Sequence, residues 1–164
     1  MARKVFYSFY YDDDASRVQQ VKNIGVIESQ PILAGNKWEE VRKGGDAAIE
    51  KWIKEQMAGK SCAVVLVGSR TASRPWVKYE IKKAWGDGLG VVGVRIHGLK
   101  DLQTQQTSIR GASPFDGLTL KNTAFSQIVT LYDPPGADSK AVYASISNNL
   151  EALVEAAIKI RAKY

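Results

Sequence analysis

One run of residues constrains the fold more than any other, a buried strand that leads at once into a helix. Ala63 to Val67 are apolar residues in succession, as is typical of a strand in the middle of a parallel sheet covered on both faces. After a short polar loop, Pro75 suits the first turn of a helix, where its missing N–H has no role. Helical spacing gives this helix a core-facing stripe of Val77, Ile81, Ala84 and Trp85.

Trp76 and Glu80 lie four residues apart, so they share one edge of that helix. They come after the end of a central strand. In open α/β sheets, ligands bind outside the carboxyl ends of the strands. A carboxylate beside an indole at this edge is therefore the first candidate for chemistry.

The rest of the chain alternates strands with helices, which predicts one α/β domain over residues 1–164 around a central, mostly parallel five-stranded sheet. Further strands are expected at 5–11, 24–27, 91–96 and 126–131, with a loop punctuated by Pro31, Gly35 and Asn36 after the second of these. One of Asp12–Asp14 is expected to be the N-cap of a helix, and Asp46 that of another. The core-facing residues expected in these helices and in a C-terminal helix over 138–164 are Ala15, Val18, Val21, Ile49, Trp52, Ile53, Met57, Val142, Ile146, Leu150, Leu153, Ala157 and Ile160.

The polar residues 98–127 lack a clear period and are predicted to form a long loop or insertion. Loops of this length are uncommon unless they have a function. Two roles stay open, a lid over the site and a surface insertion for contact with a partner.

The net charge of +6 is compatible with a partner that carries phosphates, such as a dinucleotide, a nucleic acid or an anionic membrane. The charges are scattered, with one concentration at Arg70, Arg74, Lys78, Lys82 and Lys83. The single cysteine, Cys62, falls in the buried strand and is expected to be an inert core thiol. No long apolar run resembles a signal peptide or membrane span, so we expect a cytoplasmic protein without a membrane partner.

The residues at the ends of the predicted strands exclude several familiar sites. A dinucleotide-binding Gly-x-Gly-x-x-Gly is absent after the first strand, where three aspartates stand instead, and no P-loop occurs. The central strand closes with Gly68-Ser69 rather than the aspartate of a phosphoacceptor receiver domain. A Ser-His-Asp hydrolase would need a nucleophile elbow, which is absent. His97, the only histidine, is expected to be structural.

Two segments together resemble a TIR domain. They are Val5-Phe6-Tyr7-Ser8-Phe9 with Asp12 or Asp13 after it, and Trp76-Val77-Lys78-Tyr79-Glu80-Ile81 after a strand that ends in Gly68-Ser69. More closely, the chain resembles the bacterial ThsB-type proteins of Thoeris antiphage defence. The likeness runs from Lys4 to about Asp101, includes Trp38-Glu39 and Gly45-Asp46, and returns at 113–116. It fades over 24–35 and over the C-terminal third.

This resemblance implies a flavodoxin-like, three-layer fold and cleavage of NAD⁺ at the nicotinamide–ribose bond, with Glu80 as the catalytic residue. It also implies a cyclic ADP-ribose isomer as the product, which would act as a second messenger for a separate NAD⁺-depleting effector. NAD⁺ would be the substrate, so no cofactor and no metal are expected. Self-association is common in TIR enzymes, and a homo-oligomer is an open expectation.

The chemistry of NAD⁺ suggests roles for the residues near Glu80. Phe9, Tyr10 and Trp76 are candidates to stack on the nicotinamide or adenine ring. Ser8 and Ser69 could donate hydrogen bonds to ribose or phosphate, and Arg74 could offset the pyrophosphate charge. Asp13 joins this set of substrate-binding candidates, whereas Asp46 is interpreted as a helix cap.

Two other functions stay open at the level of the sequence. The first is a non-enzymatic TIR-like signalling adaptor that acts by surface assembly. The second is a nucleoside deoxyribosyltransferase or nucleosidase, which shares the sheet architecture and a catalytic carboxylate. Nucleic-acid binding rests on net charge alone and is not expected; it would appear as a steep salt dependence of binding.

Overall fold

The protein is described from a computed structural model, which covers residues 2–33 and 35–164, without the side chains of 35–38. Ala34, in the loop expected around Pro31 and Gly35, and the side chain of Trp38 therefore lie outside the described residues. The elements in the N-terminal half are β1 (Lys4–Ser8), α1 (Tyr11–Lys22), β2 (Glu28–Ser29), α2 (Gly35–Lys43), α3 (Gly45–Met57) and β3 (Cys62–Val67). The remaining elements are η1 (Thr71–Ser73), α4 (Pro75–Gly86), β4 (Gly90–Arg95), β5 (Thr119–Leu120), β6 (Thr123–Ala124), η2 (Phe125–Gln127), β7 (Leu131–Tyr132) and α5 (Ser139–Arg161).

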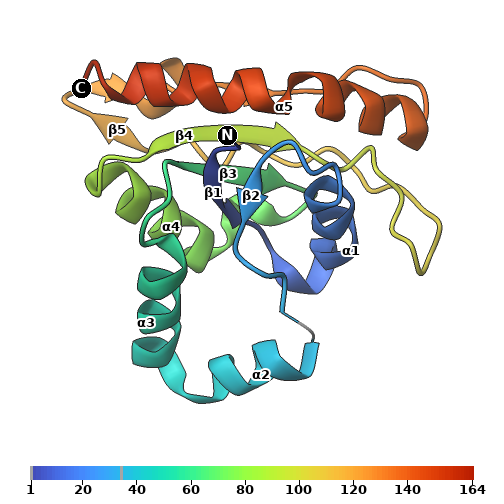
Figure 1. The fold of residues 1–164 in the computed structure, drawn as a ribbon, viewed down its shortest axis with the longest axis horizontal. Helices are drawn as coiled ribbons and strands as arrows, with labels where there is room; N and C mark the ends of the chain where they lie inside the picture. Colours follow the sequence, from blue (N-terminus) through green and yellow to red (C-terminus); the bar gives the residue numbers. More distant parts are fainter. Residues whose placement is uncertain (1, 34) are drawn as a thin grey trace.

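The central sheet has five strands in the order β2-β1-β3-β4-β7, and every pairing is parallel. Helices cover both of its faces, with α5 along one side and α3 and α4 on the other (Figure 1). This strand order is the flavodoxin-like one. The predicted α/β class with a parallel five-stranded sheet is confirmed.

Alternation along β3 explains the layers. Cys62, Val64 and Leu66 face a core with the helices α1 and α5, whereas Ala63, Val65 and Val67 face a core with α3 and α4. Both faces of the strand are buried, as the apolar run predicts. On β1 the same alternation sends Phe6 and Ser8 toward the α3/α4 side.

The helix α4 begins with Pro75 in its first turn, and Val77, Ile81 and Ala84 are buried as expected. Trp85 is only half-buried. Glu80, which shares an edge of the helix with Trp76, is buried with 7% of its surface exposed. A glutamate is almost never this buried without a partner, so its surroundings matter for function.

The first strand is shorter than predicted, because Tyr11 already begins α1. Asp12, Asp13 and Asp14 therefore lie in the first turn of the helix, and the prediction that one of them is the N-cap is wrong; Tyr10 has that position. The prediction for Asp46 is wrong in the same way, since Gly44 precedes the helix. Carboxylates in a first turn still favour the helix, because they face its positive end.

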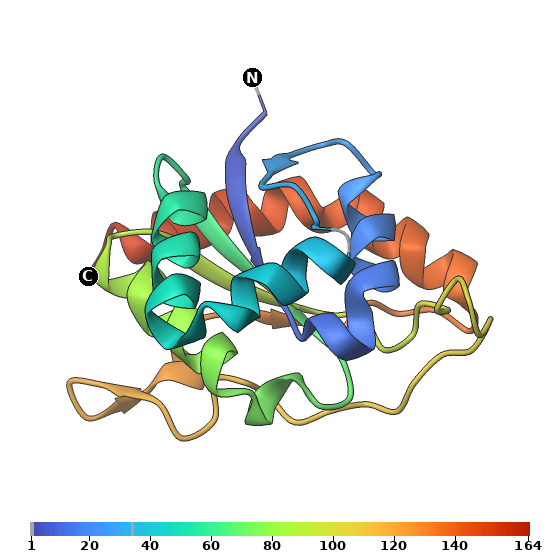
Figure 2. The ribbon, with the colours of Figure 1, turned by 90° about the horizontal axis from the view of Figure 1, so that it is seen from below.

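Three short elements also differ from expectation. The second strand lies at Glu28–Ser29 and not at 24–27, where Ile24 and Val26 pack from a loop onto the core. The helix α2 replaces an expected loop and crosses from the α1 side of the molecule to the foot of α3 (Figures 1 and 2). The last strand is Leu131–Tyr132, preceded by η2 where a strand over 126–131 is predicted.

The C-terminal helix forms where it is predicted, although its buried face differs in detail. The helix α5 begins after Asp138, which accepts a hydrogen bond from the backbone N–H of Ala141. Val154 is buried in place of the expected Leu153 and Ile160, which are half-buried. The 98–127 segment contains a small β5–β6 hairpin. Its strands have two residues each, which is too short for an alternating pattern to show in the sequence.

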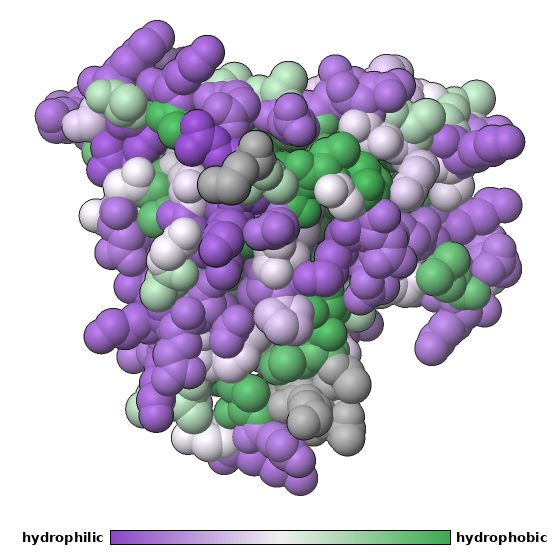
Figure 3. Space-filling model, viewed as in Figure 1, coloured by the Kyte–Doolittle hydropathy of each residue, from purple (hydrophilic) through white to green (hydrophobic). Residues whose placement is uncertain are grey.

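The surface is mostly hydrophilic on the face shown in Figure 3. Among the described residues, the exposed large apolar side chains are Leu102, Ile109 and Tyr164. Within the same residues, no helix is both long enough and apolar enough to cross a membrane.

Candidate active site

The site is organised around a hydrogen bond between residues that are 72 positions apart. The Ser8 hydroxyl, at the end of β1, donates to Oε1 of Glu80 on α4 at 2.6 Å. Ser8 is fully buried and Glu80 nearly so. The inward-facing position of Ser8 on its strand and the packing of α4 against the sheet bring the two side chains together beneath the carboxyl edge of the sheet.

Burial raises the pKa of the Glu80 carboxyl to about 8, against the opposing effect of the hydrogen bond from Ser8. The low-dielectric surroundings disfavour the carboxylate form. Glu80 is therefore mostly protonated at neutral pH in the unliganded protein. A perturbed carboxyl in a cleft is a candidate for catalysis.

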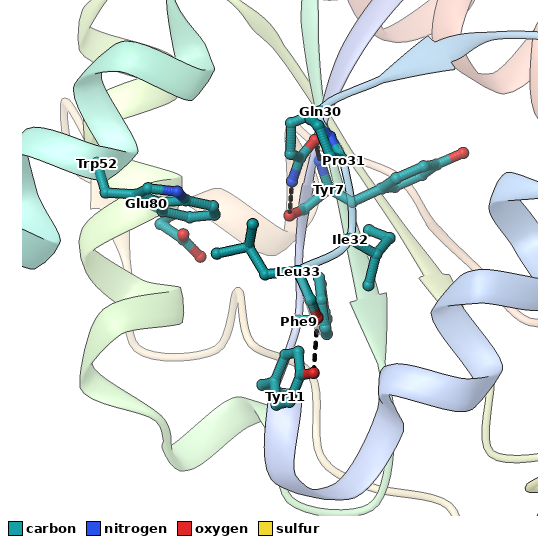
Figure 4. A pocket seen from close by; sticks show the side chains of 9 residues that line it. All are labelled: Tyr7, Phe9, Tyr11, Gln30, Pro31, Ile32, Leu33, Trp52 and Glu80. Carbon is teal, nitrogen blue, oxygen red and sulfur yellow. Dashed lines mark hydrogen bonds between the residues drawn. The ribbon is translucent and has the colours of Figure 1, made fainter. Parts of the chain in front are cut away.

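Glu80 lines a small cavity that we call the inner chamber (Figure 4). Its free volume is about 40 Å³, enough for water molecules but far below the size of a nucleotide site. The side chain of Leu33 points toward Glu80 and Trp52. The lining consists of Tyr7, Phe9, Tyr11, Gln30, Pro31, Ile32, Leu33, Trp52 and Glu80.

Two contacts fix the segment that enters the chamber from β2. The Gln30 side chain accepts a hydrogen bond from the Tyr7 backbone N–H at 3.0 Å and donates one to the Tyr7 carbonyl at 2.9 Å. It thus continues the β1–β2 ladder after the strand itself has ended. Further along, the Tyr11 hydroxyl donates to the Leu33 carbonyl at 2.7 Å (Figure 4).

A second hollow, the outer groove, adjoins the chamber and shares Phe9 and Tyr11 with it. Its volume is about 270 Å³. The Arg74 guanidinium lies over the Tyr10 ring, 4.1 Å from its centroid, and Trp76 packs edge-on against Tyr79. The full lining is Phe9, Tyr10, Tyr11, Asp12, Arg42, Ile49, Arg74, Pro75, Trp76 and Val77. Cations and aromatic rings together suit a ligand with phosphates and planar bases.

Comparison with family models places residues 6–101 in one family, described as the Thoeris protein ThsB, TIR-like domain. This match covers more than half of the chain. The chain is a member of the ThsB TIR-like family. It is also similar to a curated protein of Bacillus cereus (strain MSX-D12), named "Putative cyclic ADP-D-ribose synthase ThsB1". The two are 34% identical over an alignment of 141 residues that covers 83% of this chain and 73% of the relative.

Most of the residues singled out from the sequence lie at the two hollows of this ThsB-type domain. Glu80, Ser8 and Phe9 belong to or adjoin the inner chamber, and Tyr10, Arg74 and Trp76 line the outer groove. The structure thus brings together six of the eight predicted site residues. Their roles toward a substrate stay predictions.

Asp13 and Ser69 are not brought into either hollow. The Arg70 guanidinium binds both carboxylate oxygens of Asp13, which lowers the pKa of that carboxyl. Ser69 lies in the loop after β3, where its carbonyl faces Gly111 of the 98–127 segment. Their assignment as substrate-binding residues stays a prediction that the geometry of the hollows does not support.

Sequence reasoning misses three residues of the site. The helical spacing of Trp52 predicts a core-facing side chain, and that spacing is the same for a residue that faces a cavity. Gln30 falls where the resemblance fades, and no pattern marks a side chain that pairs with backbone. Arg42 belongs to the unexpected helix α2 and forms an ion pair with Asp12 at 2.5 Å.

The 98–127 segment does not reach the ThsB-type hollows; of the described residues, none in that range lines either one. It is held elsewhere, because Arg17 donates to the carbonyls of Leu99 and Gln106, and Arg95 to that of Gly111. In this arrangement it covers neither hollow, and its Leu99, Phe115 and Phe125 are buried in the core.

His97 is half-buried, and burial lowers the pKa of its imidazole. It is not part of either hollow. Within residues 2–33 and 35–164, no group of His, Cys, Asp or Glu side chains is arranged to hold a metal ion.

Proposed function

We propose that this chain cleaves NAD⁺ at the nicotinamide–ribose bond and converts the remainder to a cyclic ADP-ribose isomer, with Glu80 as its catalytic residue. The observation that carries the proposal is the buried Ser8–Glu80 pair in an aromatic chamber at the carboxyl edge of the sheet. The family membership and the name of the Bacillus cereus relative support the same reaction.

Cleavage needs little from the protein besides a carboxylate. The C1′–N bond breaks, its electron pair goes to the pyridinium nitrogen, and nicotinamide leaves as a neutral molecule, so a general acid is not required. Positive charge develops on the ribose, as in other glycoside cleavages. The Glu80 carboxylate, in a low-dielectric pocket, would stabilise that charge strongly. The cationic substrate would itself favour the ionised form of Glu80 on binding.

Closure to a cyclic product requires a nucleophile from the same molecule to reach C1′ before water does. If a ribose hydroxyl attacks, Glu80 can accept its proton, which balances the step. The enclosed, mostly apolar lining of the chamber favours this outcome because it holds few water molecules. The free volume of about 40 Å³ is small for a nicotinamide ring, so the scheme includes an outward movement of residues 31–33 when the substrate enters.

We further propose that the cyclic product is a diffusible signal for a separate effector protein. A homo-oligomer as the active form and a cytoplasmic location belong to the same proposal. NAD⁺ is the substrate in this scheme, without a further cofactor.

The decisive experiment incubates NAD⁺ with the wild type and with Glu80→Gln, and separates the products by mass-resolved chromatography. We expect the wild type to release nicotinamide and to form a product that is one water lighter than ADP-ribose. If Glu80→Gln does neither, the result supports both the reaction and the role of Glu80. Linear ADP-ribose as the sole product would contradict the cyclase step. Base release from free nucleosides but not from NAD⁺ would favour a nucleosidase, and no turnover at any protein concentration would favour an adaptor.

A further inference from the structure

One wall of the inner chamber is aromatic, and neither the family match nor the resemblance gives this wall a role. Trp52, on α3, lines the chamber together with Glu80, and the two side chains overlap in the view of Figure 4. Trp76, the tryptophan nearer to Glu80 in sequence, lines the outer groove instead. The two tryptophans therefore serve different hollows.

The indole of Trp52 is held in place from behind. It packs edge-on against Phe6 of β1, with ring centroids 6.4 Å apart and planes at 63°. Trp52 is half-buried on a helix whose neighbouring turns are anchored by the buried Ile49 and Ile53. A large aromatic side chain fixed in this way is preorganised for contact with a planar ligand.

We infer that Trp52 binds the nicotinamide ring of NAD⁺ and holds it beside Glu80. This rests on the proposed function. The ring of NAD⁺ is a planar cation, and tryptophan is the side chain that attracts such cations most strongly. The space for the ring is that now taken by Leu33, whose side chain points to the same place. Trp76, with Tyr10 and Arg74, is left to contact the rest of the dinucleotide.

The charge of the ligand determines which kinetic constant Trp52 affects. The positive charge is on the base in the bound substrate and moves to the ribose as the bond breaks. Trp52 therefore stabilises the bound substrate at least as much as the transition state, and its removal raises KM more than it lowers kcat.

The test compares Trp52→Leu with Trp76→Leu, and uses Trp85→Leu as a matched control. Trp85 is also half-buried, but it packs against Phe125 and lines neither hollow. For each protein, KM and kcat for NAD⁺ are measured, with inhibition constants for nicotinamide and for ADP-ribose. Trp52→Phe serves as the conservative variant, since it keeps a ring at this position.

We expect Trp52→Leu to raise both KM and the inhibition constant of nicotinamide several-fold, with kcat within about twofold and ADP-ribose inhibition unchanged. Trp52→Phe should recover part of the loss. An unchanged nicotinamide constant, or an equal rise for both inhibitors, would overturn the inference, as would a nicotinamide effect in Trp76→Leu alone. If the wild type releases no nicotinamide from NAD⁺, the proposed function itself fails. That outcome is distinct from the outcomes above, which compare KM and inhibition constants between active variants.

Discussion

The Ser8 hydroxyl and the Glu80 carboxyl are joined by a 2.6 Å hydrogen bond in a place where water scarcely reaches either group. Glu80 has no cation among its hydrogen-bond or ion-pair partners in the described part of the chain, so a single neutral donor supports it. This arrangement costs stability whenever Glu80 is ionised. Acidic groups maintained at such a cost are usually functional.

Glu80→Gln should stabilise the fold above neutral pH. The pKa of Glu80 is raised from 4.5 to about 8, so between these values the folded protein holds a proton that the unfolded chain has released. Stability contributed by this group therefore falls as pH rises, by at most about 1.4 kcal/mol per pH unit. Glutamine is neutral and can still accept from Ser8.

Urea unfolding of both proteins at pH 5 and pH 8 checks this prediction. The difference in free energy of unfolding should be small at pH 5 and favour the variant clearly at pH 8. The buried Asp14, whose pKa burial raises to about 6, is present in both proteins and so cancels in the difference. A difference that does not change with pH would contradict the raised pKa.

Ser8→Ala should shift the pH dependence of catalysis. The hydrogen bond from Ser8 lowers the pKa of Glu80, so its loss raises that pKa further above 8. If the carboxylate is the active form, kcat/KM rises with pH through this pKa, and the rising limb moves to higher pH in the variant. Activity at pH 7 should fall several-fold and recover at high pH. A uniform loss at every pH would instead indicate damage to the chamber.

The sequence predicts the scaffold of the site better than its interior. The apolar run 63–67 and the proline at 75 locate β3 and α4 because burial on both faces and helix starts leave clear patterns. The pairing of Ser8 with Glu80 leaves none, since helical spacing places Glu80 on an edge but does not say what covers that edge. The same limit applies to Trp52, because the helical spacing of a residue is the same whether its side chain faces the core or a cavity.

The short elements are the hardest to predict. The strand β2 pairs through two residues, and the Gln30 side chain then takes over the hydrogen bonds to β1. A strand of that length has too few residues for alternation to be detectable. The entry to the chamber, from Gln30 to Leu33, is therefore the part of the candidate site that sequence reasoning does not reach.

Gln30→Ala should destabilise the protein by about 1–3 kcal/mol, because it leaves the buried backbone N–H and carbonyl of Tyr7 without their partner. Thermal or urea unfolding measures the loss. Gln19→Ala is a suitable control, since the Gln19 side chain donates a hydrogen bond to Asn23 on the surface of α1. If the two substitutions lower the free energy of unfolding equally, the buried contacts of Gln30 contribute no more to stability than an exposed hydrogen bond.

Gly111→Ala tests whether the 98–127 segment acts as a lid. A methyl group at Gly111 would lie 2.3 Å from the Gly68 carbonyl oxygen and 2.8 Å from that of Ser69, so the backbone must move away from the end of β3. This displacement also weakens the contact between Arg95 and the Gly111 carbonyl. Overpacking of this kind costs about 1–3 kcal/mol. Hydrogen exchange in residues 98–112 should therefore increase.

The ratio of cyclic to linear product should nevertheless stay the same in Gly111→Ala. Of the described residues, none in this segment lines the chamber, so its displacement gives water no new path to Glu80. Gly86→Ala is a matched control, because a methyl group there meets open space. A rise in linear ADP-ribose confined to Gly111→Ala would mean that the segment closes over the site during turnover, and a surface insertion would then be the wrong interpretation.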